Sequence, residues 1–272
     1  MKQTTIGEDG SILLPGKAVT WFEFLEISRL TNSDYGGWNS KSFWFERGLN
    51  RLSPEIIYQW TVNSLSDKAL PKPRKKDFKL ERADTTARLE AEQSGIKSLN
   101  DSGINKLTEN KLNAVLHTKD YWPCAWGNFL SYEVPLADES DGQLKIDLLG
   151  TGDKSLSIVE LKQAKSPSNT PLMALIEAIC YSIQIIRCKS NLPNKHQSFE
   201  TIRIILAAPE AYWNQWRSKN HPEWSPRTWS PKLAAIVAAV NHKLPEDVKL
   251  SLELYSLEYE SKKVTVKLIP AE

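Results

Sequence analysis

The sequence predicts an α/β fold whose core follows the order helix, three strands, helix, strand. Between residues 129 and 164, three short apolar runs, FLSYEVPL, QLKIDLLG and SLSIVELKQA, are separated by the acidic or Gly-containing turns ADESDG and GTGDK. Such runs are typical of neighbouring strands joined by turns. Residues 171–187, PLMALIEAICYSIQIIR, are apolar nearly all round and too numerous for a strand, so we expect a buried helix with proline in its first turn. Residues 201–209, TIRIILAAP, are rich in β-branched side chains and end in proline, which predicts a further buried strand.

Helices are expected on both sides of this core segment. One extends from about residue 84 to residue 93, where Ser94 and Gly95 supply a stop. Another begins near Asn105, because apolar residues recur close to the helical period through INKLTENKLNAVL, and Glu109 lies on this helix. After residue 209, EAYWNQW and KLAAIVAAVNHK predict two helices separated by a loop around HPEWSPRTWSP, and VKLSLELYSLE and KKVTVKLI predict a last pair of strands.

The first 80 residues predict a helical, Trp-rich N-terminal extension. Apolar groups recur at helical spacing in WFEFLEISRL and SPEIIYQWTVNSL, and the stretch holds Trp21, Trp38, Trp44 and Trp60. The following stretch LPKPRKKDFKL, from Leu70 to Leu80, contains two prolines and five basic residues and predicts a linker. We therefore expect an extension or accessory lobe at residues 1–80 and an α/β domain at residues 81–272, with its core at about residues 104–209.

Composition excludes several classes of protein. The chain has 35 basic and 33 acidic residues, so a nucleic-acid partner would have to be held by local patches rather than by a global field. Cys124, Cys180 and Cys188 have neither CxxC spacing nor nearby histidines, which predicts reduced, buried thiols and no structural zinc. No apolar run approaches the roughly 18 residues of a membrane span and no signal peptide is recognisable, so we expect a cytoplasmic protein without a membrane partner. Motifs for dinucleotides, a P-loop or a serine hydrolase are also missing from the sequence.

Three charged residues interrupt the apolar strands. Along SIVELKQ, residues 157–163, side chains alternate between faces, so Glu160 and Lys162 share one face. Asp147 lies in the preceding strand, in KIDLLG, between two apolar neighbours. Buried charges are unfavourable unless they are compensated, and a bound cation with a second acidic group would compensate them. Paired carboxylates bind hard cations such as Mg²⁺, which suits metal-assisted hydrolysis.

These residues resemble the PD-(D/E)XK superfamily of restriction-endonuclease-like nucleases. Asp147 matches its first acidic position and Glu160-Leu161-Lys162 its E-x-K triplet, although Ile146 rather than proline precedes Asp147. The resemblance covers residues 104–209 and implies a restriction-endonuclease-like core with Mg²⁺ or Mn²⁺ as cofactor, DNA as the most suitable substrate and a possible homodimer.

The resemblance also implies a role for each residue. Asp147, Glu160 and the Leu161 carbonyl hold the metal, and Lys162 orients or activates the attacking water. Glu109 stands where many members carry a further glutamate close to the metal. One difficulty arises from the hairpin, because a turn at Gly150–Lys154 leaves Asp147 three or four positions from the residue opposite Glu160. That offset corresponds to roughly 10–13 Å, so we expect a bulge, bend or splay of the hairpin.

Structural explanations remain open beside this interpretation. Glu160 and Lys162 could pair with each other or with cross-strand partners, and Asp147 could bind the following turn. A catalytically silent nuclease-like domain that binds nucleic acid or a protein is the alternative function. For a further set of residues, core packing or exposure at the surface is the simpler explanation, and contact with a substrate is the alternative. These residues are Glu133, Tyr181, Gln184, Trp213, Trp216, Trp224, Trp229 and the basic run at residues 74–76.

Overall fold

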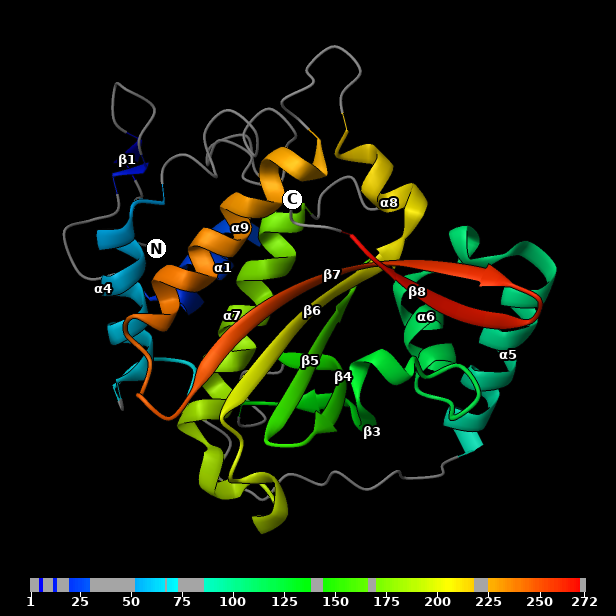
Figure 1. The fold of residues 1–272 in the computed structure, drawn as a ribbon, viewed down its shortest axis with the longest axis horizontal. Helices are drawn as coiled ribbons and strands as arrows, with labels where there is room; N and C mark the ends of the chain where they lie inside the picture. The colour runs from blue at the N-terminus through cyan, green and yellow to red at the C-terminus, as the bar shows by residue number, and fades with distance from the viewer. Residues whose placement is uncertain are drawn as a thin grey trace.

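A six-stranded mixed sheet forms the centre of the protein (Figure 1). The computed structural model describes residues 5–6, 12–13, 20–29, 52–66, 68–72, 86–137, 144–165, 170–217 and 225–269. The strands, in the order in which they lie side by side, are β3 (Asn128–Pro135), β4 (Lys145–Gly152), β5 (Ser155–Leu161), β6 (Thr201–Pro209), β7 (Lys249–Glu260) and β8 (Lys263–Leu268). Strands β5, β6 and β7 are parallel and the outer pairs are antiparallel. A separate antiparallel pair comprises β1 (Thr5–Ile6) and β2 (Ile12–Leu13).

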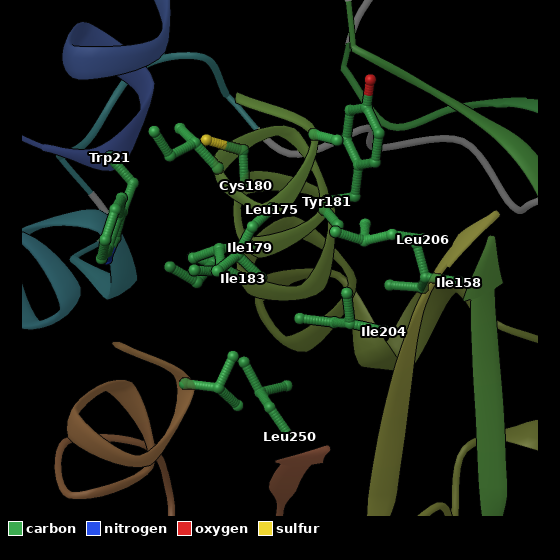
Figure 2. Packing of buried hydrophobic residues seen from close by; sticks show 14 of the residues in the cluster. Trp21, Ile158, Leu175, Ile179, Cys180, Tyr181, Ile183, Ile204, Leu206 and Leu250 are labelled. Atoms are coloured by element: carbon green, nitrogen blue, oxygen red, sulfur yellow. The ribbon is translucent and has the colours of Figure 1, made fainter. Parts of the chain in front are cut away.

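One face of the sheet is covered by the buried helix α7 (Pro171–Arg187). Thr170 caps this helix by accepting a hydrogen bond from the Met173 N–H, and Pro171 occupies its first turn, which fixes where the helix begins. Figure 2 shows Ile158, Ile204 and Leu206 of the sheet packed against α7, with Trp21 on the other side of the helix. The same hydrophobic cluster includes residues of α1 (Trp21–Arg29), α4 (Pro54–Leu65), α8 (Glu210–Gln215) and α9 (Pro226–Asn241).

The described helices of the N-terminal extension therefore share the core of the α/β domain. Trp21 and Trp60 are buried in the cluster around α7. Arg187, at the end of α7, donates to the carbonyls of Ala69 and Pro71, each at 2.9 Å, and so ties the chain after α4 to the same helix. Trp38, Trp44 and the basic run at residues 74–76 lie outside the described residues.

The opposite face of the sheet carries a second helical layer (Figure 1). Its elements are α5 (Thr86–Ser102), the short helix η3 (Ile104–Lys106), α6 (Glu109–Leu116) and the short helix η4 (Cys124–Trp126). Two more short helices, η6 (Lys189–Asn191) and η7 (Asn194–His196), connect α7 to β6. None of the described helices is long and apolar enough to cross a lipid bilayer.

Gly95 does not end a helix, contrary to the expected stop, because α5 continues to Ser102. A Cβ atom on Gly95 would lie 3.0 Å from Val115 Cγ2 and 3.2 Å from the Lys111 carbonyl oxygen. The glycine thus allows α5 and α6 to approach closely, and this tertiary requirement outweighs its low helix propensity.

Other expectations also differ from the structure. The helix expected from near Asn105 is divided into η3 (Ile104–Lys106) and α6, which begins at Glu109. Helix α9 begins at Pro226, inside the segment expected to be a loop, because Pro226 stands at the first helical position, where a proline needs no N–H partner. Cys124 is exposed on η4, whereas Cys180 and Cys188 are buried as expected, and all three are free thiols.

Candidate metal and catalytic site

Strand β5 directs Glu160 toward the layer that contains α7, and Lys162, directly after the strand, follows the same direction. Its residues alternate, since Leu156 and Ile158 belong to the cluster around α7 whereas Val159 and Leu161 belong to the cluster around α6. Glu160 and Lys162 follow the parity of Ile158, and each is only 3% exposed. The two charges expected to share a face therefore do so, at the carboxyl end of a central strand.

The hairpin register brings Asp147 into line with Glu160, so the expected offset of three or four positions is wrong. The turn is confined to Asp153 and Lys154, since Gly152 pairs with Ser155. The pairing continues regularly to Leu148 and Val159, where it ends, and the same register extended by one position would place Asp147 opposite Glu160. One carboxylate oxygen of Asp147, Oδ2, accepts a hydrogen bond from the Leu161 N–H at 2.8 Å.

The chain nevertheless bends at Asp147. Ile146 belongs to the cluster around α7 and Leu148 to the cluster around α6, although residues two apart in a regular strand point to the same face. Glu133 lies across from Asp147 on β3, is exposed and has a left-handed φ of 45°. The pairing of β4 with β5 ends just before this point, so β3 and β4 diverge from the sheet where the charged residues gather.

Carboxylates from three elements contact the Lys162 ammonium. Its Nζ atom contacts Glu160 Oε1 of β5 and lies 3.1 Å from Oε2 of Glu177, on α7. Glu109 Oε2, at the first position of α6, is 3.8 Å away. With Asp147 of β4, four acidic side chains thus surround one basic side chain, and they come from the sheet and from both helical layers.

The electrostatics follow from this imbalance of charge. Burial raises the pKa of Asp147 to about 7, and the charges of Glu109 and Glu177 add to this effect while Lys162 opposes it. Burial also raises the pKa of Glu160 well above its usual range and raises that of Glu109. Burial lowers the pKa of Lys162, but the carboxylates, Glu160 foremost, outweigh it and leave that pKa well above normal. Lys162 is therefore an ammonium at neutral pH, and the acids are short of positive charge.

The donor chemistry of this cluster fits a hard divalent cation. Glu160 is buried, and a hydrogen bond between its carboxyl group and that of Glu177 contributes to its raised pKa, whereas Asp147 and Glu109 are partly exposed. Carboxylate oxygens are the preferred ligands of Mg²⁺ and Mn²⁺. In the part of the chain that the structure describes, no group of three or more His, Cys, Asp or Glu side chains is arranged to hold a metal ion, and Lys162 Nζ lies among the acids.

Glu177 is the residue of this cluster that the sequence analysis missed. It is the only charged residue of α7 before Arg187, and it is buried. A carboxylate in an otherwise apolar helix is the same signal that identified Asp147 and Glu160 in the strands. The pattern of apolar residues did not distinguish Glu177 as a buried charge, because both faces of α7 are buried and α7 has no exposed polar face.

The other candidate residues that the structure describes on and after α7 are buried. Tyr181 packs its ring in the cluster around α7, and burial, with Glu160 second, raises the pKa of its phenol well above normal. Gln184 is fully buried and donates to the Pro71 carbonyl at 3.3 Å. Trp213, Trp216 and Trp229, which were considered as platforms for stacking of bases, are core residues. Trp224 lies outside the described residues.

Comparisons of the chain with protein-family models, with curated proteins and with solved structures give no match.

Proposed function

We propose that this protein is a Mg²⁺- or Mn²⁺-dependent phosphodiesterase that cleaves nucleic acid, with DNA as the preferred substrate. The observation that carries the proposal is the convergence of Glu109, Asp147, Glu160 and Glu177 around the single ammonium of Lys162. Four buried or partly buried acids with one base leave an excess of negative charge that is unfavourable in a folded protein. A divalent cation would neutralise that excess.

The topology supports the same proposal. Helix α6, the meander β3–β4–β5, helix α7 and the parallel strand β6 follow one another as in the nuclease superfamily that the sequence resembles. The acids lie at the carboxyl end of β5, where a ligand site is expected next to parallel strands. Fold alone does not imply function, so the proposal depends on the acidic cluster.

In the proposed reaction, Asp147, Glu160 and the Leu161 carbonyl would hold the cation, with Glu109 beside it at the more exposed edge. When bound, the cation would acidify a water molecule and neutralise charge on the phosphate. The Leu161 N–H fixes the Asp147 carboxylate through its hydrogen bond of 2.8 Å. The Lys162 ammonium would act as a donor that orients the water or stabilises the developing negative charge.

The alternative function is a silent nuclease-like domain that binds nucleic acid or a protein. It is favoured by one observation, namely that Lys162 already pairs with Glu160 and Glu177, so that the cluster is partly neutralised without a metal. In that case the acids and Lys162 form a structural network, and no DNA or RNA substrate is cleaved.

A cleavage panel tests the proposal. The protein is incubated in excess over duplex, single-stranded and branched DNA and over RNA, with Mg²⁺, with Mn²⁺ or with EDTA. We expect cleavage of at least one DNA form with metal, and none with EDTA or with the Glu160→Gln variant purified in parallel. Absence of metal-dependent cleavage of every form by the folded protein would favour the binding module, and cleavage that persists in Glu160→Gln would exclude this site as its source.

A further inference from the structure

Glu177 is compensated by Lys162. Its side chain is 9% exposed and its Oε2 atom lies 3.1 Å from Lys162 Nζ. The surrounding residues of α7 are apolar, and α7 is packed on the sheet through its contacts with β5 and β6. A carboxylate held in such a rigid and apolar environment can fix the position of a partner ammonium closely.

The other two acids that contact Lys162 are less suited to this task. Glu160 stands on the same strand, and under the proposed function it is a ligand of the cation, so its charge is shared with the metal. Glu109 is 3.8 Å from the ammonium and its side chain is 37% exposed. Glu177 alone among the three is both close to Lys162 and outside the proposed ligand set.

We infer that Glu177 is a positioning residue that holds the Lys162 ammonium in the direction required by the reaction, without itself contacting substrate. The inference rests on the proposed function. It assigns the two neighbours of Lys162 to different tasks: Glu160 binds the metal, whereas Glu177 anchors the lysine. The predicted defect of a Glu177 variant is therefore a slower chemical step with unchanged binding of DNA.

The decisive variant is Glu177→Gln, which keeps the shape of the side chain and loses its charge. We expect single-turnover cleavage to slow by about 10-fold to 100-fold, because small displacements of a catalytic group reduce the rate by such factors. The dissociation constant for DNA, measured in Ca²⁺ to prevent cleavage, should stay within about 2-fold, because the lost interaction acts in the transition state. Glu177→Asp retains the charge with a shorter reach and should restore part of the rate.

A double-mutant cycle separates positioning from general damage. In the Lys162→Ala background, Glu177→Gln should slow cleavage by less than about 2-fold, since the group that it positions is gone. Glu92→Gln is the matched control, because Glu92 is also a buried helical glutamate and pairs with Arg88 at 3.0 Å and with His117 at 2.7 Å in the other helical layer. Glu92→Gln should reduce stability without changing the cleavage rate of the folded fraction.

The outcomes distinguish this inference from the proposed function. If the parent protein cleaves with metal and both Glu177→Gln and Glu177→Asp cleave at the parental rate, Glu177 has no positioning role and the nuclease proposal stands. If the rates fall equally in the parental and Lys162→Ala backgrounds, Glu177 acts by another route and the inference is wrong. If the folded parent protein cleaves no substrate, the proposed function fails, and the inference fails with it.

Discussion

Replacing Asp147 by asparagine should stabilise the metal-free protein at alkaline pH. In the folded state the pKa of Asp147 is raised to about 7, from a usual value of 3.8, mainly by burial. A carboxyl group whose pKa is raised by folding favours the folded state while it is protonated and loses that contribution as pH rises. The loss begins near pH 4 and is complete above pH 7.

The magnitude follows from the shift. About 3 pH units at about 1.4 kcal/mol each give an upper limit of about 4 kcal/mol. Asp147 is partly exposed and its acidic neighbours can relax, so we expect about 2 kcal/mol at pH 8. Asparagine retains an oxygen that can accept the hydrogen bond of the Leu161 N–H, which is 2.8 Å long in the parent protein, so the variant removes the charge and little else.

Urea denaturation followed by tryptophan fluorescence measures the effect, with EDTA present at pH 4 and pH 8. The two proteins should have equal free energies of unfolding at pH 4, and Asp147→Asn should be the more stable at pH 8. Mg²⁺ should then stabilise the parent protein and not the variant. Asp247→Asn is the control, because Asp247 pairs with Lys189 at the surface and that hydrogen bond lowers its pKa. Asp247→Asn should therefore be less stable than the parent protein at pH 8, whereas Asp147→Asn should be more stable.

A destabilised Asp147→Asn at pH 8 without metal would refute this reasoning. It would mean that Lys162 and the Leu161 N–H compensate the Asp147 carboxylate fully. The cluster would then be a structural network, and the argument from its unbalanced charge would lose its basis.

Two further outcomes are expected. Lys162→Ala should lower single-turnover cleavage by orders of magnitude while DNA affinity, measured by filter binding, is largely spared, because in the proposed reaction its ammonium acts on the transition state. Cleavage at the parental rate by the folded, metal-loaded variant would contradict the proposed mechanism. Gly127→Ala should reduce the free energy of unfolding by about 2 kcal/mol, because Gly127 has a φ of 86° and a Cβ there would lie 2.6 Å from the Thr151 carbonyl oxygen. An unchanged urea midpoint would contradict this prediction, because it would show that the chain at Gly127 can move away from Thr151 of β4 without loss of stability.

The sequence predicted those elements whose limits depend on local chemistry. The bounds of α7 and β6 agree with the expected residues, because Thr170 and Pro171 define the start of the helix and Pro209 ends the strand. Tertiary contacts decided the cases that differed. Gly95 looks like a stop unless the close approach of α6 is known.

The candidate site was also predicted only in part, because some of its features depend on local sequence and others on tertiary contacts. Asp147, Glu160 and Lys162 stand out as charges within apolar strands, and the structure brings all three together. Their register depended on whether Thr151 and Gly152 belonged to the turn or to the strand, which composition does not decide. Glu177 has no such signal in the helical pattern, because α7 is apolar around Glu177 and buried on both faces.

The bend at Asp147 has a consequence for when the site first exists during synthesis of the chain. Because β3 and β4 diverge there, acids from α6 and from α7 reach the same ammonium from opposite sides of the sheet. The segments that carry these acids emerge from the ribosome one after another, and β6, which holds β5 in place, emerges after them. A chain that ends before β6 therefore lacks a strand that holds β5 in place. The proposed hydrolytic activity would then be absent until β6 has been synthesised and has paired with β5.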